Sequence, residues 1–175
     1  MSSAVSGAAP RFGSPLPPDL AQPTASGLVI EDYSTHGKWR LVGGQQTVPL
    51  GRAALEGKRI TFSVSPGEWI VIDEQNGTSA AVAPPSVPGV RVVDITHLRA
   101  ALRLTGDRAP DVLARLCSLD ITEQMFPSGG AARTLVAKVA TEVVRLDRQG
   151  QRSYLLLASR SFGRYLYEAI ADATG

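Results

Sequence analysis

Residues Leu102–Asp120 read LRLTGDRAPDVLARLCSLD, and this stretch decides the fold class. Arg99–Thr105 alternates toward a strand with both of its leucines on one face. Asp107 is placed to cap a following helix, and Pro110 falls within the first turn, where its missing N–H does little harm. The spacing i, i+3, i+4, i+7, i+8 then predicts an apolar helical stripe made of Ala109, Val112, Leu113, Leu116 and Cys117.

More strands and a second helix are predicted after this stretch. Thr134–Leu146 is rich in β-branched residues and predicts one long or two broken strands. Asp147–Gly150 (DRQG) has turn chemistry, and Tyr154–Ala158 is a fully apolar strand. Ser161 is expected to cap the last helix. The apolar stripe of that helix comprises Phe162, Tyr165, Leu166, Ala169, Ile170 and Ala173.

The preceding part of the chain looks like a worn copy of the same pattern. Trp39–Gly44 (WRLVGG) is similar to Leu102–Asp107 (LRLTGD), since both are strand-like runs that end at a glycine turn. Later in each half comes an apolar run, EWIVID at Glu68–Asp73 and SYLLLAS at Ser153–Ser159. The helices of the first half are expected in QQTVPLGRAAL and NGTSAAVA, and both are weak. Each half therefore predicts the order strand, helix, strand, strand, helix.

Composition separates a tail from one folded domain. Residues 1–26 are rich in Ser, Ala, Pro and Gly and have almost no large apolar side chains, so a disordered tail is predicted. Residues 27–175 form the expected domain, in which APPSVPG at Ala83–Gly89 separates pseudo-repeats at about 33–83 and 90–173. Two such units that share sheets make an α+β domain.

Several broad classes of protein are disfavoured by composition. The formal charge is +2 and the basic residues are scattered, so no nucleic-acid role is expected. No apolar run approaches the roughly 18 residues of a membrane span, and the N-terminus lacks the features of a signal peptide. Cys117 is the only cysteine, which fits a reducing cytosol and predicts a cytoplasmic location.

Motifs for cofactors, metals and nucleophilic catalysis are not found in the sequence. The pairs Gly43–Gly44 and Gly129–Gly130 lack the G-x-G-x-x-G spacing and indicate tight turns. His36 and His97 have no partner at ligand spacing, so no metal site is expected. Cys117 lies on the apolar stripe of its helix, where a free cysteine behaves as a small hydrophobe. No catalytic residue is assigned.

Three polar residues remain as candidate binding residues. A strand through Val92–Leu98 (VVDITHL) would direct Asp94 and Thr96 to one face, and the alternative is an edge strand with one solvated face. Arg133 and Arg160 each stand beside a hydroxyl residue, and an arginine fork there could bind a carboxylate of a partner chain or of a ligand. The competing interpretation for both arginines is a structural ion pair or plain solvent exposure.

Four blocks follow one another in the second half: Leu102–Gly106, Asp107–Asp120, Phe126–Ala137 and Tyr154–Tyr167. In this order they resemble the gamma subunit of the heterotetrameric sarcosine oxidases, and SPGEWIVI at Ser65–Ile72 is similar to that family's Pro-x-Glu-Trp block. The family is a small relative of the folate-binding aminomethyltransferase (glycine-cleavage T-protein) fold. The resemblance therefore implies two ferredoxin-like repeats.

The resemblance also implies a function. The chain would be a non-catalytic gamma subunit of a complex that oxidatively demethylates sarcosine or a related N-methyl amine and passes the one-carbon unit to tetrahydrofolate. FAD, FMN, NAD and tetrahydrofolate would be held by partner subunits (alpha, beta and delta), so no cofactor is expected on this chain. A partner would cover an exposed apolar patch, expected at Met125–Phe126 and around Phe162, Tyr165 and Tyr167.

The alternative is a stand-alone folate-binding protein of one-carbon transfer. It predicts a central pocket with an acidic or arginine anchor, such as Asp94 or Arg160. The polyglutamate of a folate would be the ligand that an arginine fork binds there.

Overall fold

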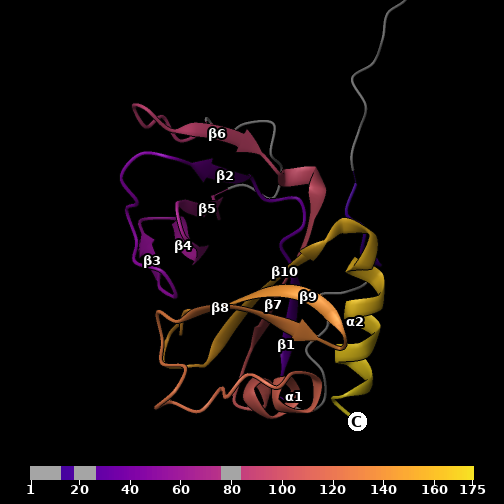
Figure 1. Cartoon of the computed structure of the whole chain (residues 1–175). Coiled ribbons are helices and arrows are strands. Elements are labelled where there is room, and N and C mark those ends of the chain that lie inside the picture. The colour runs from indigo at the N-terminus through magenta and orange to yellow at the C-terminus, as the bar shows by residue number, and fades with distance from the viewer. Residues whose placement is uncertain (1–12, 18–26, 76–83) are drawn as a thin grey trace, which may run out of the picture.

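The computed structural model describes residues 13–17, 27–75 and 84–175 (Figure 1). Its elements follow in chain order: β1 (Val29–Asp32), β2 (Lys38–Val42), β3 (Ala53–Glu56), β4 (Arg59–Ser65), β5 (Glu68–Asp73), β6 (Arg91–Asp94), the 3-10 helix η2 (Thr96–Leu98), β7 (Arg99–Thr105), α1 (Ala109–Leu116), β8 (Ala131–Val136), β9 (Val139–Arg145), β10 (Ser153–Ser159), the 3-10 helix η3 (Arg160–Phe162) and α2 (Gly163–Asp172). Two antiparallel sheets with few helices confirm the predicted α+β class.

Each sheet has five strands. Sheet A has the order β1-β7-β10-β9-β8, and sheet B has the order β3-β4-β5-β2-β6. In Figure 1 sheet B lies above sheet A, and both α1 and α2 lie against sheet A. Sheet A is therefore a middle layer between the helices and sheet B.

Two strands pair in a way that the predicted repeats do not describe. β1 comes first in the chain but pairs with β7, with Val29 opposite Thr105 and Asp32 opposite Leu102. β6 lies within the predicted second repeat but completes sheet B beside β2. β1, which precedes the predicted first repeat, therefore joins the sheet of the second half, and β6 joins the sheet of the first half, so these two strands tie the sheets together.

The strands of the second half follow the sequence pattern closely. β7 spans Arg99–Thr105 as predicted, and the β-branched region resolves into the two strands β8 and β9. The turn at Asp147–Gly150 has positive φ at Gln149 and Gly150, as a tight turn between antiparallel strands requires. The prediction of one buried face on β7 was too narrow, because residues 100–104 are buried on both sides of this middle-layer strand.

Both helices of the second half were predicted, but their caps were not. Asp107 does not cap α1, which begins at Ala109 after a turn in which the Ala109 N–H donates to the Gly106 carbonyl at 3.1 Å. Ser161 does not cap α2, because η3 precedes this helix and carries its backbone hydrogen bonds into Gly163. Backbone turns thus replace side-chain caps at both starts. Within the described ranges, no helix is long and apolar enough to cross a membrane.

The helix predicted in QQTVPLGRAAL is wrong. Pro49 lacks an N–H, and Gly51 has a φ of +76°, so the chain turns here and enters β3. Gly51 donates to the carbonyl of Ser63 and accepts from the N–H of Ala131, at 2.8 and 2.9 Å, which fixes the turn between the two sheets. The helix predicted in NGTSAAVA lies outside the described residues.

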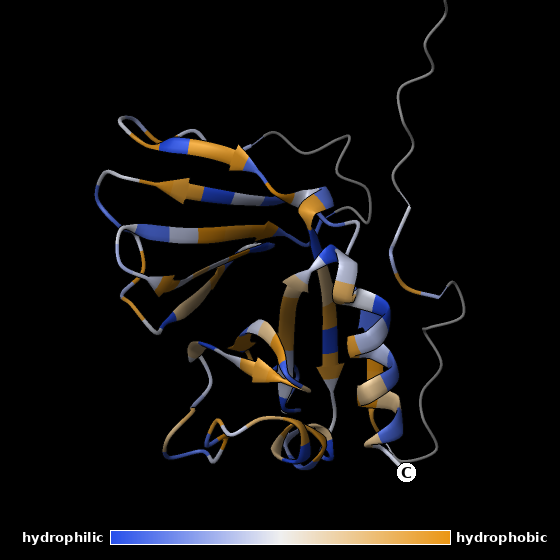
Figure 2. Cartoon of the chain, turned by 45° about the vertical axis from the view of Figure 1, so that its right-hand side comes forward, coloured by the Kyte–Doolittle hydropathy of each residue, from blue (hydrophilic) through white to orange (hydrophobic). Residues whose placement is uncertain are grey.

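Three apolar clusters hold the layers together, and Figure 2 shows hydrophobic residues recurring along the strands of both sheets. The first joins sheet A to α1 and α2, with Leu166 and Ile170 of α2 at its centre. The second lies between the sheets. Its buried members are Ile60, Phe62, Ile70, Ile72, Ile95, Ala101, Ala131, Val144, Leu155 and Leu157. The third covers the other face of sheet B and contains Trp39 and Trp69.

Part of the predicted tail packs on the fold. Of residues 1–26, only residues 13–17 are described, and within them Leu16 is buried in the cluster beneath α2. An added Cβ at Gly163 would lie 3.1 Å from Pro15 Cγ and 3.3 Å from Leu16 Cδ2, so this segment sits close against the start of α2. The composition argument missed this contact because it averaged over the tail, whereas one leucine beside prolines suffices to dock it.

Candidate functional site

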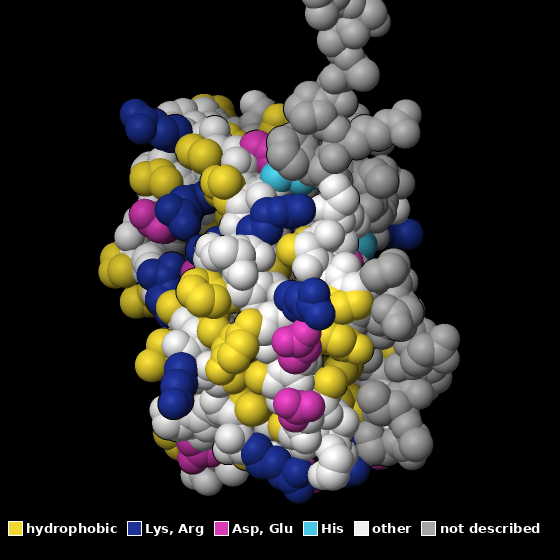
Figure 3. Space-filling view, turned by 90° about the vertical axis from the view of Figure 1, so that its right-hand side faces the viewer, with side chains coloured by type: hydrophobic (Ala, Val, Ile, Leu, Met, Phe, Trp, Pro, Cys, Tyr) yellow, Lys and Arg dark blue, Asp and Glu magenta, His cyan; other side chains and the backbone are white. Residues whose placement is uncertain are grey.

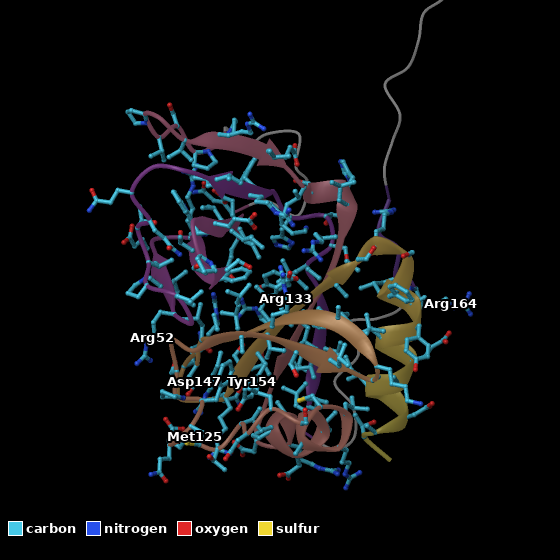
Figure 4. All side chains as sticks on the ribbon, viewed as in Figure 1. Arg52, Met125, Arg133, Asp147, Tyr154 and Arg164 are labelled. Atoms are coloured by element: carbon cyan, nitrogen blue, oxygen red, sulfur yellow. The ribbon has the colours of Figure 1, made fainter. Side chains whose placement is uncertain are left out.

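A buried carboxylate on sheet A gathers two arginines. Glu142 of β9 is buried, and its Oε1 accepts hydrogen bonds from Arg99 at 2.9 Å and from Arg133 at 2.8 Å. Glu142 and Arg133 are cross-strand partners. The alternation of the strands places all three side chains on the face of sheet A that is turned toward sheet B, and Figure 4 shows Arg133 between the two sheets.

A third arginine reaches this place from sheet B. Arg40 of β2 lines a narrow crevice between the sheets together with Arg133, Phe62 and Ile70, and its volume is about 10 Å³. Within the described residues Arg40 has no ion-pair partner. We call Arg40, Arg99, Arg133 and Glu142 the inter-sheet arginine cluster. Its three guanidinium groups outnumber its one carboxylate, and a second carboxylate, that of Glu68, also lines the crevice.

Of the three predicted binding residues, only Arg133 belongs to this cluster. Its ion pair matches the structural interpretation, yet its side chain is still 48% exposed. Arg160 is half-buried and donates to the carbonyl of Gly13 at 2.7 Å. Asp94 lies at the end of the edge strand β6, which matches the edge-strand alternative. The strand predicted through Leu98 ends at Asp94, because the Asp94 carboxylate accepts from the Thr96 N–H at 2.8 Å and η2 begins.

Asp94 also borders a pocket on the outer face of sheet B. Asp94 and Trp39 are cross-strand partners there. The pocket has a volume of about 440 Å³, and its lining residues are Trp39, Pro84, Pro85, Ser86, Val87, Val90, Val92 and Asp94. An aromatic ring, apolar side chains and one carboxylate make this a place where a small molecule with a cationic or N–H group could bind.

Lys38 is a buried lysine whose charge interacts with two of the predicted binding residues: Asp94 raises its pKa and Arg160 lowers it. Lys38 is fully buried, and its Nζ donates to the carbonyls of Tyr33, Ser34 and His36 at 3.0, 2.8 and 2.7 Å. Burial lowers the pKa of Lys38 to about 7, and the carboxylates of Asp32 and Asp94 act in the opposite direction. The sequence carries no signal for this burial, because a lysine at the start of a strand is usually solvated.

A second charged centre pins the two sheets together. Arg103 of β7 is buried, contacts Glu74 at 2.7 Å and Ser153 at 3.0 Å, and lies 4.7 Å from the ring centroid of Tyr33. Tyr33 in turn stacks on His36, with the ring centroids 4.3 Å apart. Burial raises the pKa of Tyr33 and, together with Lys38, lowers the pKa of His36. Sequence reasoning missed this centre, since Arg103 lies within a run that reads simply as a strand.

The predicted apolar patch is present only in part. Met125, Phe162 and Tyr165 are exposed, and the Tyr165 hydroxyl donates to the carbonyl of Ala137 at 3.2 Å. Phe126 and Tyr167 pack against the core instead, because they lie on the inner sides of their segments. Figure 3 shows the side of the molecule on which α2 lies, where hydrophobic side chains alternate with charged ones.

Cys117 and the potential metal ligands are the remaining candidates for chemistry. Cys117 is half-buried, its thiol donates to the carbonyl of Leu113 at 3.2 Å, and burial raises its pKa, so the reactive thiolate is disfavoured. Within the described ranges, no three potential metal-ligating side chains converge.

Two curated proteins are similar in sequence to this chain. No protein-family model matches it. The "Sarcosine oxidase subunit gamma" of Corynebacterium sp. (strain P-1) is 29% identical over 134 residues, and that of an Arthrobacter species is 27% identical over 133 residues. In both cases the match covers 75% of this chain but only 64% of the relative.

Two solved structures are similar in fold. A chain of the heterotetrameric sarcosine oxidase from Corynebacterium sp. U-96, in complex with pyrrole 2-carboxylate, matches with a TM-score of 0.74 and 19% identity, over 93% of this chain and 94% of that one. The glycine cleavage system aminomethyltransferase T from Bartonella henselae matches with a TM-score of 0.59 and 12% identity, over 82% of this chain and 45% of that one. These similarities confirm the resemblance predicted from the four sequence blocks.

Proposed function

We propose that this chain, a relative of the sarcosine oxidase gamma subunits in sequence and in fold, is a non-catalytic subunit of a sarcosine-oxidase-type complex. The observation that carries the proposal is the sequence match to two proteins of that name together with a fold match along nearly the whole of one chain of such an oxidase. The chain supplies a scaffold to the complex.

The charged side chains of the interior support a scaffolding role. Glu74 is engaged by Arg103 and Arg148, and Glu142 is engaged by Arg99 and Arg133. Each carboxylate is held by two arginines, and these charge-assisted hydrogen bonds fix the strands that carry them. These ion pairs hold the two sheets in position relative to each other. Exposed apolar side chains such as Phe162 and Tyr165 remain for contact with other chains.

The complex would oxidise sarcosine or a related N-methyl amine and pass the one-carbon unit to tetrahydrofolate. FAD, FMN, NAD and tetrahydrofolate would be bound by the alpha, beta and delta partners. A cytoplasmic location fits the single cysteine of the chain.

Purification of the chain through a C-terminal tag, from the cells that encode it, tests the proposal. We expect larger chains to co-purify in constant proportion, with a flavin absorbance spectrum and sarcosine-dependent oxygen uptake. Cells that lack this chain should fail to assemble the remaining subunits into a stable complex. A chain that purifies alone, monodisperse and without flavin would contradict the proposal.

The pocket beside Asp94 favours one second candidate, a stand-alone folate-binding protein. Its volume of about 440 Å³ lies within the range of small-molecule sites. Calorimetric titration of the isolated chain with tetrahydrofolate tests this candidate, with Asp94→Asn as the matched variant. No heat of binding at millimolar ligand would remove it.

A further inference from the structure

We infer that the inter-sheet arginine cluster binds an extended, carboxylate-bearing segment of a partner chain. The inference rests on the proposed function, because it names the chemistry by which this subunit would recognise a neighbour in the complex.

The first argument is charge. Arg99 and Arg133 share the carboxylate of Glu142, and each uses one N–H group in its hydrogen bond to it. The crevice beside Arg40 and Arg133 is also lined by Glu68, so three guanidinium groups stand against two carboxylates. A guanidinium has five N–H donors, so the cluster keeps unused donors, and Arg40 has no ion-pair partner in the described part of the chain. A carboxylate that bridges Arg40 and Arg133 would use them.

The second argument is an acceptor without a donor. Oε2 of the buried Glu142 has no hydrogen-bond partner in the described structure. A simple anion such as sulfate offers only acceptors, and so it cannot satisfy this oxygen. A peptide segment offers both groups: its side-chain carboxylate can accept from the arginines, and its backbone N–H can donate to Oε2 once the half-exposed Arg133 side chain moves off this enclosed atom. The cluster therefore selects a peptide over a simple anion.

The third argument is the apolar surround. Leu98 is 62% exposed beside Arg99, and Leu135 is 58% exposed two residues beyond Arg133 on the same face of β8. Val93, the cross-strand partner of Arg40, is exposed as well. Exposed apolar side chains around a charged centre are the arrangement of a protein contact.

The fourth argument is size. The crevice of about 10 Å³ between Arg40 and Arg133 holds at most a single water-sized group, so a small molecule cannot be enclosed there. A segment that lies across the mouth and places its carboxylate against the half-exposed guanidinium of Arg133 needs no enclosed space. β8 is at the edge of sheet A, and since Ala131 at its start already donates to the carbonyl of Gly51, an extended chain would lie beside its second half, from Arg133 onward.

Binding of this chain to the complex that lacks it tests the inference. Biolayer interferometry would compare the wild type with Arg40→Gln and Arg40→Glu, which break no internal ion pair. Arg164→Glu is the matched control, because Arg164 is 76% exposed and pairs only with Glu168 on α2 (Figure 4). Thermal unfolding of each variant confirms that it folds.

We expect Arg40→Glu to weaken binding at least tenfold, Arg40→Gln to weaken it less, and Arg164→Glu to stay within twofold of the wild type. A higher salt concentration should weaken the binding of the wild type to the complex more than the binding of Arg40→Glu. Equal binding of wild type and Arg40→Glu would overturn the inference and leave the proposed function intact. A wild type that does not bind the complex at all would overturn both.

A photo-crosslinking residue at position 135 identifies the occupant. The crosslinked peptide should come from a partner subunit and contain Asp or Glu. A crosslinked segment without either residue, or no crosslink to any partner, would refute the inference.

Discussion

Arg103 lies in the interior with its guanidinium 2.7 Å from Glu74 and 4.7 Å from the ring centroid of Tyr33. The same pattern recurs at Glu142 and at Lys38, where each buried polar group finds two or three partners. Buried charges persist only where hydrogen bonds offset the loss of water. At the scale of single residues, these groups determine how the two sheets meet.

Replacement of Arg103 by Met should lower the free energy of unfolding by about 3 kcal/mol or more, because Glu74 stays buried and loses one of its two arginines. Urea denaturation measures the change. The double variant Arg103→Met with Glu74→Gln should lose less than the sum of the single variants, since it removes the stranded charge. Additive losses would show that the two residues are not coupled.

His36 predicts a loss of stability in acid. Burial and Lys38 lower the pKa of His36 in the folded state, whereas an unfolded histidine titrates near 6.5. As the pH falls through about 6.5, His36 therefore binds a proton in the unfolded state but not yet in the folded state. Protonation thus favours the unfolded state, and the free energy of unfolding decreases. His36→Phe, which keeps an aromatic ring against Tyr33, should reduce this decrease.

Urea denaturation at several values between pH 7.5 and pH 5 checks the His36 prediction. The free energies of unfolding of the wild type and of His36→Phe should change in parallel with pH at the upper end of this range. Below about pH 6.5 that of the wild type should decrease more steeply. The same decrease in both proteins would contradict it.

At the scale of elements, the approach of β1 to β7 depends on one glycine. Gly106 ends β7 with a φ of +133°, and a Cβ built there would lie 2.2 Å from the carbonyl oxygen of Gly27, just before β1. That oxygen belongs to the backbone, so it cannot rotate away as a side chain could. The turn that the sequence pattern predicts thus also makes room for a strand from the other end of the chain.

Gly106→Ala should therefore lower the free energy of unfolding by about 2 kcal/mol or more and loosen β1. Gly67→Ala is the control, since Gly67 also has a positive φ but a Cβ there meets nothing within 4 Å. Gly67→Ala should lower the free energy of unfolding only by the backbone strain of a positive φ, about 1 kcal/mol. Hydrogen exchange of β1 measures the loosening, and equal effects of the two substitutions would exclude the close approach as the cause.

At the scale of the whole molecule, the cluster between the sheets makes the two units interdependent. Phe62 from sheet B is fully buried in it with Leu155 and Leu157 from sheet A. The arginine bridges and the strands β1 and β6 add to this coupling. We therefore expect both sheets to unfold together.

Phe62→Ala tests this coupling. It should lower the free energy of unfolding by about 3–5 kcal/mol, because it leaves a cavity between the sheets. Hydrogen exchange followed by mass spectrometry should show weaker protection in β10 and β9 as well as in β4 and β5. A loss confined to sheet B would mean that the two units unfold independently.

The sequence predicted local structure well and long-range contacts poorly. The strand Arg99–Thr105 and the two helices of the second half follow from side-chain periodicity, which neighbouring residues determine. The helix expected at Gln45–Leu55 failed because Pro49 and Gly51 outweigh a weak apolar stripe. Arg133 was found because it stands at the edge of a strand, but its companions Arg40 and Glu142 were not.

By itself, the sequence determined the class of the fold, the elements of the second half and the family that the chain resembles, since each depends on short-range order of residue types. Only the tertiary structure decided that β1 joins sheet A and β6 joins sheet B. It alone placed Arg99 and Arg133 on Glu142 and brought Arg40 to the same crevice as Arg133. The physical reason is that strand pairing and burial of charge are properties of contacts between residues far apart in the chain, which no local pattern records.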